Sequence, residues 1–300
     1  METKQLGNTD ISISAIGLGE MPMSVSGRPP ESQAIEVIHR ALDLGVTLID
    51  TADAYCKDEF DKHHGEQLIH KALQQYEGDT DRIIVATKGG LMRPYGSWTN
   101  NGNPDHLRET IRTSFESLGG EKPIDLWQFH WPDPDHTIEE SMTPAKEAVE
   151  EGLVRFVGVS NFSVEQINRA RDVVDIVSVQ NQYNPWHRQP EFDGVLDYCE
   201  NEKLTFLPWS PLGGSSRVSR LEDISVISEL AREKGVSVYS IVLAWLRAKF
   251  SCIVPIPGAS KVSSIEDSVS SVEIKLSSKE VEQIDRKTSS STSDKLSVRS

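Results

Sequence analysis

Short apolar runs of strand type recur along the chain, and polar residues follow each of them. The runs occupy residues 47–49, 83–87, 124–129 and 154–159. The polar residues that follow them are Asp50, Lys88, His130 and the pair Ser160 and Asn161. Because a (β/α) barrel builds its active site at the carboxyl ends of its parallel strands, we expect these side chains to converge.

Segments with helical periodicity separate these runs. The predicted helices span residues 31–44, 66–75, 104–118, 137–151, 194–202, 224–234, 238–248 and 261–270, and another begins after Ser163. Further short strands are predicted at residues 14–19, 176–180, 205–209 and 253–255. Gly45 follows the first helix as a C-cap, and Ser163 forms a capping box with Gln166.

This alternation predicts a single (β/α)8 barrel, because strand and helix repeat about eight times and the strands are apolar throughout. A doubly wound sheet would also alternate, but it would concentrate its polar chemistry at one switch point. We expect a small β-hairpin at residues 4–13, before the barrel. One barrel domain should span residues 1–288 and end in a helix at 277–288, followed by a disordered Ser/Thr-rich tail at 289–300.

Composition narrows the possible partners and compartments. The chain of 300 residues has a formal net charge of −15, which argues against nucleic acid and anionic lipid, since both require basic patches. Its three cysteines are widely spaced, as is typical of reducing compartments. The amino terminus is polar, and no run approaches the ~18 apolar residues of a membrane helix, so we expect a cytoplasmic protein. We also expect a monomer without a bound metal.

The candidate catalytic residues are Asp50, Tyr55, Lys88 and His130. A lysine ammonium beside a tyrosine stabilises tyrosinate and lowers the pKa of the phenol. An aspartate keeps that lysine charged, and a histidine N–H can hold a carbonyl oxygen. Such a set can give a proton to a developing alkoxide, and the matching hydride for carbon implies a nicotinamide cofactor. A Schiff-base aldolase that uses Lys88 is an alternative chemistry.

Gly17 and Gly19 begin a stretch that could be read as the dinucleotide-binding fingerprint Gly-x-Gly-x-x-Gly. Pro22 stands in place of the third glycine, and proline cannot lie inside the helix that this motif opens. The sequence therefore favours a strand end at which the backbone approaches a ligand closely, and it argues against a Rossmann fold.

Over nearly its whole length the chain resembles the aldo-keto reductases. The motifs that carry the resemblance are residues 50–55 with Gly65 and Glu66, then 87–88, 129–130, 158–162, 180–184, 209–213 and 256–261. The resemblance implies a barrel that binds NADPH in extended form without a Rossmann fold. It also implies Tyr55 as the general acid, with Asp50, Lys88 and His130 as supporting residues.

The resemblance implies cofactor contacts position by position. The implied contacts near the nicotinamide are Gly19, Glu20, Met21, Asp50, Ser160, Asn161, Gln180 and Trp209, and those near the pyrophosphate are Ser210, Leu212 and Gly213. Ser260 and Lys261 match residues that grip the 2′-phosphate of NADPH. The chain departs from the family at Ser264, where many members have arginine, and at Asp267 and Ser268, where they have a Glu-Asn pair. Because serine cannot grip phosphate as arginine does, we expect only a moderate preference for NADPH.

Long loops at the barrel mouth are expected to form the substrate pocket. Its candidate wall residues are Trp131, Phe60, Met92, Trp98 and Trp186, with Tyr95 and His187 as further candidates. An aromatic, weakly charged pocket suits apolar or aromatic aldehydes and ketones. The sequence thus predicts an NADPH-dependent reductase of small carbonyl compounds. The alternative is a nicotinamide-bound regulatory or sensing subunit similar to potassium-channel β subunits, in which the same four residues occur.

Overall fold

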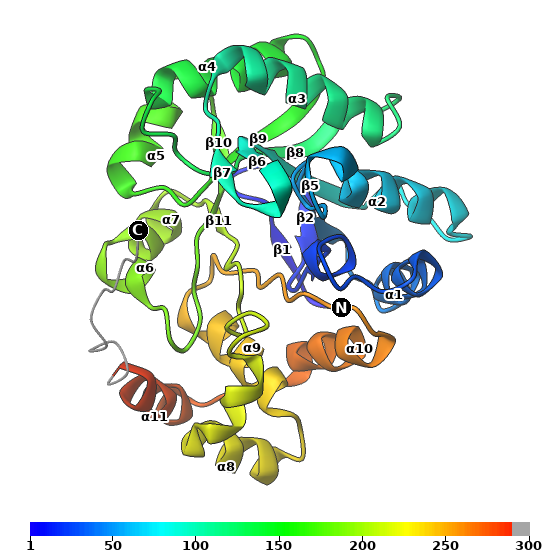
Figure 1. Ribbon diagram of the computed structural model, residues 1–300. Coiled ribbons are helices and arrows are strands. Elements are labelled where there is room, and N and C mark those ends of the chain that lie inside the picture. Colours follow the sequence, from blue (N-terminus) through cyan, green and yellow to red (C-terminus); the bar gives the residue numbers. More distant parts are fainter. Residues whose placement is uncertain (290–300) are drawn as a thin grey trace.

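The computed structural model describes residues 1–289, in which helices surround a curved parallel sheet (Figure 1). In spatial order the strands of this seven-stranded sheet are β11 (Thr205–Phe206), β10 (Ile176–Gln180), β9 (Val154–Ser160), β8 (Ile124–Phe129), β5 (Ile84–Gly89), β4 (Leu48–Asp50) and β3 (Leu18–Gly19). Each pair of neighbours is parallel. The predicted barrel is confirmed.

Residues 252–258 take the eighth position and close the barrel. On one side Val254 N donates to Phe206 O at 2.9 Å, and on the other Gly17 N donates to Pro255 O at 2.8 Å. The predicted strand at 253–255 is therefore in place, but it forms only isolated bridges. Pro255 and Pro257 have no N–H to contribute to a ladder, which explains why no regular strand forms here.

The helices follow the strands in the predicted alternation. They are α1 (Glu31–Asp43), α2 (His64–Gln75), α3 (Pro104–Ser117), α4 (Ile138–Glu150), α5 (Val164–Arg171), α6 (Gln189–Phe192), α7 (Val195–Asn201), α8 (Ser225–Lys234), α9 (Val238–Lys249), α10 (Val262–Ser270) and α11 (Ser278–Ser289). The capping box of Ser163 and Gln166 opens α5 as expected. The short α6 was not predicted. The predicted tail begins at the last residue of α11, and residues 290–300 lie outside the described part of the chain.

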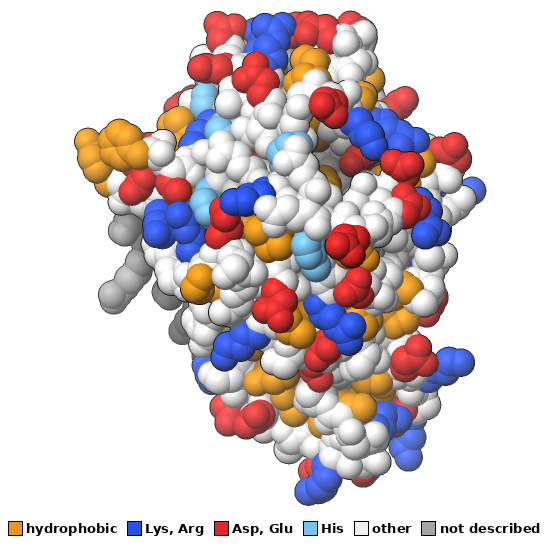
Figure 2. Space-filling model, turned by 90° about the vertical axis from the view of Figure 1, so that its right-hand side faces the viewer, with side chains coloured by type: hydrophobic (Ala, Val, Ile, Leu, Met, Phe, Trp, Pro, Cys, Tyr) orange, Lys and Arg blue, Asp and Glu red, His pale blue; other side chains and the backbone are white. Residues whose placement is uncertain are grey.

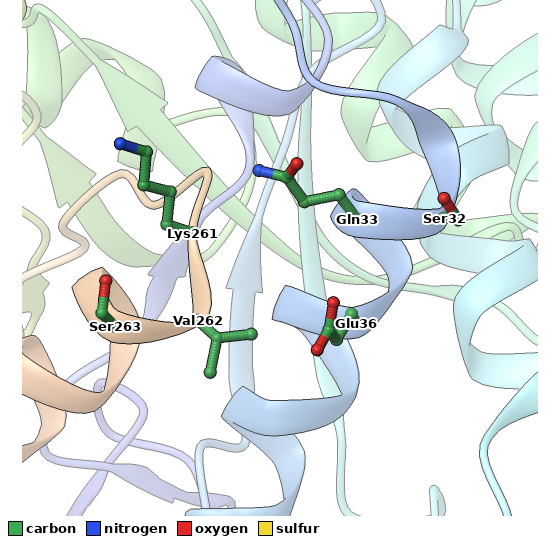
Figure 3. A pocket seen from close by; sticks show the side chains of 6 residues that line it. All are labelled: Ser32, Gln33, Glu36, Lys261, Val262 and Ser263. Atoms are coloured by element: carbon green, nitrogen blue, oxygen red, sulfur yellow. The ribbon is translucent and has the colours of Figure 1, made fainter.

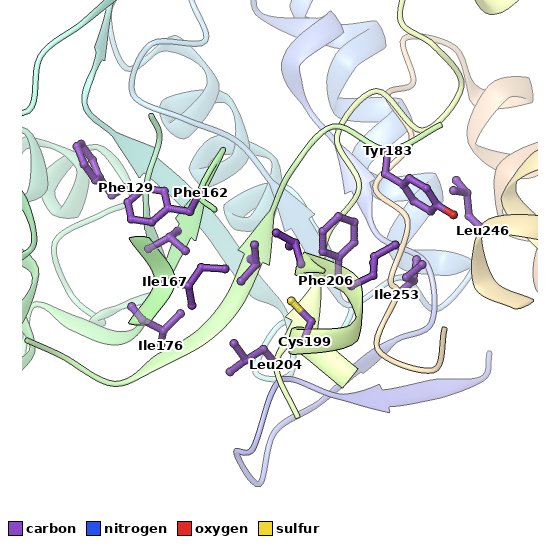
Figure 4. Packing of buried hydrophobic residues seen from close by; sticks show 14 of the residues in the cluster. Phe129, Phe162, Ile167, Ile176, Tyr183, Cys199, Leu204, Phe206, Leu246 and Ile253 are labelled. Atoms are coloured by element: carbon purple, nitrogen blue, oxygen red, sulfur yellow. The ribbon is translucent and has the colours of Figure 1, made fainter. Parts of the chain in front are cut away.

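The apolar core has two layers that hold the strands in place. The larger cluster fills the space between the sheet and the helices from α3 to α9 (Figure 4). A smaller cluster lies inside the barrel, where Leu48, Ile84 and Leu126 meet Leu6 and Ile13. The last two residues belong to the predicted amino-terminal hairpin, β1 (Thr3–Gln5) and β2 (Ser12–Ser14). The hairpin thus closes the barrel at the amino ends of its strands.

A second hairpin, β6 (Leu91–Met92) with β7 (Thr99–Asn100), extends from the carboxyl end of β5. It had no signal in the sequence, because each arm has only two residues and the exposed loop between them shows no alternation. Its place beside the end of β5 makes it part of the barrel mouth.

Candidate active site

The alternation of side chains along the strands brings polar groups together inside the barrel. On β5, Ile84 and Ala86 belong to the inner apolar cluster, and the next residue on that face is Lys88. On β8, Leu126 in the same cluster is followed at the same spacing by Gln128. The inner face of the barrel therefore changes from apolar to polar toward the carboxyl ends of the strands.

The Lys88 ammonium is the centre of the site. It donates hydrogen bonds to Asp50 Oδ1 at 2.7 Å, to the Thr51 carbonyl at 2.7 Å and to the Tyr55 hydroxyl at 3.0 Å. An ammonium has three N–H groups, so all of them are used. Lys88 is fully buried, and Asp50 supplies its opposite charge.

Two glutamines hold the second oxygen of the aspartate. Asp50 Oδ2 accepts hydrogen bonds from Gln180 Nε2 at 2.8 Å and from Gln128 Nε2 at 3.3 Å. Gln128 was missed as a site residue in the sequence. Its signal was present, since Gln128 lies two residues before His130 and so shares its side of β8.

The protonation states follow from burial and charge. Burial alone would lower the pKa of Lys88, but Asp50 and Tyr55 outweigh it and raise that pKa above its usual value. Lys88 is therefore an ammonium at neutral pH and a poor nucleophile, which argues against the Schiff-base alternative.

Tyr55 differs from the expectation for an acidified phenol. Burial raises the pKa of Tyr55 above its usual value, although the ammonium of Lys88 acts in the opposite direction. The expected net lowering is thus wrong for this state of the site, because the loss of water around the phenol outweighs one adjacent positive charge. The hydroxyl is protonated at neutral pH, as a proton donor must be.

His130 faces the Tyr55 ring, with their centroids 5.8 Å apart and the rings nearly perpendicular. Burial holds the pKa of His130 well below its usual value, and the charge of Lys88 adds a smaller effect in the same direction, so the imidazole is neutral. Its Nδ1 is buried without a hydrogen-bond partner in residues 1–289. A neutral imidazole with spare hydrogen-bonding capacity can bind a carbonyl oxygen.

A cavity of about 840 Å³ extends from these residues along the barrel mouth. It is lined by the predicted residues Gly19, Met21, Asp50, Tyr55, Trp98, His130, Trp131, Ser160, Asn161, Gln180, Trp209, Ser210, Leu212 and Ser260. Because both Tyr55 and Ser260 line this cavity, it is one continuous groove, as an extended dinucleotide requires.

Side chains in the middle of the groove hold one another. Asn161 has a left-handed backbone with φ of 64°, and its Nδ2 donates to the His130 carbonyl at 3.1 Å. Trp209 Nε1 donates to Asn161 Oδ1 at 2.9 Å, and Ser160 Oγ donates to the Gln180 carbonyl at 2.7 Å. A left-handed non-glycine residue that is fixed in this way is typical of functional sites.

A second hollow, of about 420 Å³, lies between the start of α1 and the start of α10 (Figure 3). It is lined by Ser32, Gln33, Glu36, Lys261, Val262 and Ser263. Gln33 Nε2 donates to the Ser260 carbonyl at 2.6 Å, so this hollow adjoins the end of the main groove. Lys261 is exposed and extends away from α10 in Figure 3.

Five of the residues implied as cofactor contacts do not line either space: Glu20, Gly213, Ser264, Asp267 and Ser268. Asp267 Oδ2 instead accepts a hydrogen bond from Ser237 Oγ at 2.7 Å, and Ser268 is buried on α10. Ser264 is exposed.

The aromatic residues of the loops divide into two groups. Trp98 and Trp131 line the groove beside Tyr55, and Trp98 meets the Tyr55 ring edge-on at 6.4 Å. Phe60 and Tyr95 are 92% and 94% exposed, so neither forms a pocket wall. Phe60 lies in a short 3-10 turn that directs it outward.

Two further candidates for the pocket wall also lie elsewhere. Met92 lines a separate cavity of about 150 Å³. Trp186 packs so closely on Gly213 that a Cβ there would lie 2.4 Å from the indole. Gly213, with φ of 87°, therefore serves the packing of its loop. His187 also lies outside the groove lining.

The surface carries charges of both signs. Acidic and basic side chains are interspersed over the face in Figure 2, and no continuous basic area is visible there. In the described part of the chain, every helix is too short or too polar to cross a membrane.

Comparison with known proteins identifies a family. The model of the aldo/keto reductase family matches residues 15–289. An uncharacterized oxidoreductase of Schizosaccharomyces pombe, C215.11c, is 33% identical over 281 residues, or 92% of this chain and 87% of that protein. The aldo-keto reductase YhdN of Bacillus subtilis is 37% identical over 219 residues, or 71% of this chain and 62% of that protein.

A similar fold occurs in a solved structure. The crystal structure of the thermostable aldo-keto reductase Tm1743, in complex with the inhibitor epalrestat, is 30% identical to this chain. It has a TM-score of 0.81, and the match covers 96% of this chain and 100% of Tm1743.

Proposed function

The chain belongs to the aldo/keto reductase family, and on that premise we propose that it reduces aldehydes and ketones to alcohols with NADPH. One observation carries the proposal. The hydroxyl of Tyr55 lies 3.0 Å from the Lys88 ammonium, faces neutral His130, and lines a continuous groove. That arrangement suits proton donation to an oxygen that is gaining negative charge.

The groove has the shape and chemistry for a nicotinamide dinucleotide. At Gly19, which lines the groove, a Cβ would come within 2.8 Å of the Ile256 carbonyl, so the backbone itself forms this part of the wall. Ser160, Asn161 and Gln180 would hold the carboxamide, and Ser260 with Lys261 would hold the phosphate end. When bound, NADPH would supply a hydride to the carbonyl carbon.

In this proposal the residues of the chain position the carbonyl and move the proton. His130 would hold the carbonyl oxygen through its ring N–H, and Tyr55 would donate its proton to that oxygen as it becomes an alkoxide. The Lys88 ammonium would stabilise the tyrosinate that remains. Asp50 would keep Lys88 charged and in place throughout.

The preference for NADPH rests on Lys261. Its ammonium makes no ion pair or hydrogen bond with any residue that the structure describes, and it adjoins the Ser260 end of the groove. A free cation there suits a 2′-phosphate. Because Ser264 adds no second cation and Glu36 lines the same hollow, we propose a moderate preference.

The substrates proposed are apolar or aromatic carbonyl compounds. Beside Tyr55 the groove is walled by Trp98, Trp131 and Leu91, and none of these carries a charge. A carboxylate-bearing substrate would find no cation in the groove lining. Flat aromatic aldehydes would pack between the indole rings.

The test is the rate of 4-nitrobenzaldehyde reduction by wild-type protein and by Tyr55→Phe. Loss of the proton donor should lower kcat by about 10²–10⁴-fold. NADPH should bind Tyr55→Phe as tightly as it binds wild type, measured by quenching of protein fluorescence. Wild type should prefer NADPH to NADH in kcat/KM. Equal rates for wild type and variant would show that Tyr55 is not the donor, and the absence of turnover by wild type would favour the sensing alternative.

A further inference from the structure

Glu20 is a fully buried carboxyl group that the proposed reaction does not use. It follows β3 directly, but its side chain does not line the groove. Its Oε1 accepts a hydrogen bond from Ser24 Oγ, and its Oε2 accepts one from Thr51 Oγ1 at 2.9 Å. A buried carboxylate is retained only where such partners compensate the loss of water.

The contacts of Glu20 lead to the catalytic ammonium in two steps. Glu20 fixes the side chain of Thr51, and the Thr51 carbonyl accepts a hydrogen bond of 2.7 Å from Lys88 Nζ. Glu20 N also donates to the Asp50 carbonyl at 2.9 Å. Glu20 thus contacts two consecutive residues that hold Lys88, the side chain of Thr51 through its carboxyl group and the carbonyl of Asp50 through its own backbone N–H.

The carboxyl group of Glu20 is closely packed by residues of α2. Gly65 packs against it so closely that a Cβ there would come within 2.4 Å of Glu20 Oε2 and 2.5 Å of Thr51 Oγ1. On the other side, His64 Nδ1 lies 2.7 Å from Ser24 Oγ and orients that hydroxyl toward the carboxyl group. Position 65 therefore requires a glycine, because a side chain there would collide with the carboxyl group of Glu20.

We propose that Glu20 is a positioning residue, which fixes the Thr51 carbonyl against Lys88 and, through its charge, sets how readily Tyr55 gives up its proton. This rests on the proposed function, since it concerns the same proton donor. No chain of hydroxyl groups joins Glu20 to Tyr55, because Thr51 contacts Lys88 through its carbonyl. Glu20 therefore acts through geometry and charge, not as a proton relay.

The charge of Glu20 should change near neutral pH. Burial raises the pKa of Glu20 to about 7, opposed by Ser24, Thr51 and the charge of Lys88 on β5. Asp50 on β4 adds to the increase. His64 on α2, which contacts Ser24 Oγ, has a lowered pKa, and the charged Arg28 donates to the Ser24 carbonyl at 3.2 Å. Ionised Glu20 raises the pKa of Tyr55, which makes the phenol a weaker acid. Reductive kcat should therefore fall as the pH rises through about 7.

The experiment is the pH profile of kcat for aldehyde reduction, at saturating NADPH, from pH 5.5 to 8.5. Wild type should lose about two- to fivefold in kcat across an inflection near pH 7. Glu20→Gln, which keeps the shape without the charge, should lack this inflection while its KM for NADPH stays within about twofold. An inflection that persists in Glu20→Gln would overturn the proposal, as would its absence from wild type.

Two further variants keep the test decisive if Glu20→Gln folds poorly. Ser24→Ala removes a hydrogen bond that lowers the pKa of Glu20, so the inflection should move to higher pH. Glu66→Gln is the matched control, a fully buried glutamate that instead bonds Thr87 Oγ1 and His63 Nδ1. The inflection of Glu66→Gln should stay near pH 7. A shifted inflection in Glu66→Gln, or an unshifted inflection in Ser24→Ala, would contradict the role of Glu20. Absence of turnover in wild type would refute the proposed function itself.

Discussion

The Lys88–Asp50 pair determines most of the chemistry of the site. Lys88 is completely buried and donates to three oxygens, of which only the carboxylate of Asp50 carries a full charge. Breaking a buried pair on one side leaves the other charge without compensation, whereas replacing both partners by apolar groups can cost little.

We predict that Asp50→Asn lowers the free energy of unfolding by about 3–5 kcal/mol, because Lys88 stays buried without its opposite charge. The double variant Asp50→Asn/Lys88→Met should recover much of that loss. Urea unfolding at pH 7 measures both. A loss of less than about 1 kcal/mol in Asp50→Asn, or a double variant less stable than the single one, would contradict this account of the pair.

At the scale of single residues the sequence predicts well the properties that depend on position in a strand, and less well those that depend on the surroundings in the folded chain. Asp50, Lys88 and His130 were found because each stands at a strand end, and the structure brings them together around Tyr55. The direction of the Tyr55 pKa was not predictable, because it depends on how much water surrounds the phenol. Gln128 could have been predicted, because it lies two residues before His130 and therefore on the same side of β8.

Among the elements, the amino-terminal hairpin has a purely structural place. Ser14 N donates to Thr47 Oγ1 at 2.7 Å, and Gly7 N donates to Thr205 Oγ1 at 2.7 Å. Thr205 begins β11, and Thr47 immediately precedes β4, so the hairpin covers the amino ends of the strands. The proposed catalytic residues lie at the opposite ends.

We predict that Ile13→Ala costs about 2–5 kcal/mol of unfolding free energy, because the side chain is completely buried in the inner core. The kcat of the folded variant should equal that of wild type. Ile11→Ala is the matched control, since Ile11 is only partly buried, and it should cost less. A large drop in kcat for Ile13→Ala, without loss of stability, would show that the hairpin affects the site.

The elements themselves were largely readable from the sequence, because periodicity and caps are local signals. The strand at 205–209 is shorter than predicted, with β11 ending at Phe206. The closing segment is irregular because of its prolines. The hairpin of β6 and β7 was missed because its two-residue arms are fixed by the neighbouring loops, which no local pattern reveals.

Over the whole molecule, acidic groups outnumber basic ones and some are buried. Burial raises the pKa of Glu20 to about 7 and that of Asp53 to about 6. Lys62 Nζ lies 3.3 Å from Asp53. Both pKa values are higher in the folded chain than the ordinary values expected in the unfolded chain, so the folded state binds protons first as the pH falls. The net charge of −15 acts in the same direction through self-repulsion.

We predict that Glu20 and Asp53 together contribute a rise of about 2–5 °C in the melting temperature when the pH is lowered from 8 to 5.5, since about 1 kcal/mol changes Tm by ~2 °C in a chain of this size. Histidines whose pKa is lowered by burial, such as His130 and His64, act in the opposite direction, so the contribution is measured as the difference between wild type and Glu20→Gln/Asp53→Asn. A carboxyl group whose pKa is raised by folding stabilises the folded chain increasingly as the pH falls from its folded pKa toward its unfolded pKa. Scanning calorimetry measures the change, and Glu20→Gln/Asp53→Asn should reduce it. The same dependence of Tm on pH in wild type and in the double variant would contradict the assignment.

The central claim is that Tyr55 and a nicotinamide together reduce a carbonyl at the mouth of this barrel. The most direct measurement is mass spectrometry of the alcohol formed from 4-nitrobenzaldehyde with NADPH dideuterated at C4 of the nicotinamide. We predict that wild type yields an alcohol carrying one deuterium on carbon and that Tyr55→Phe yields almost none in the same time. Alcohol without deuterium, or equal deuterated product from both proteins, would contradict the account.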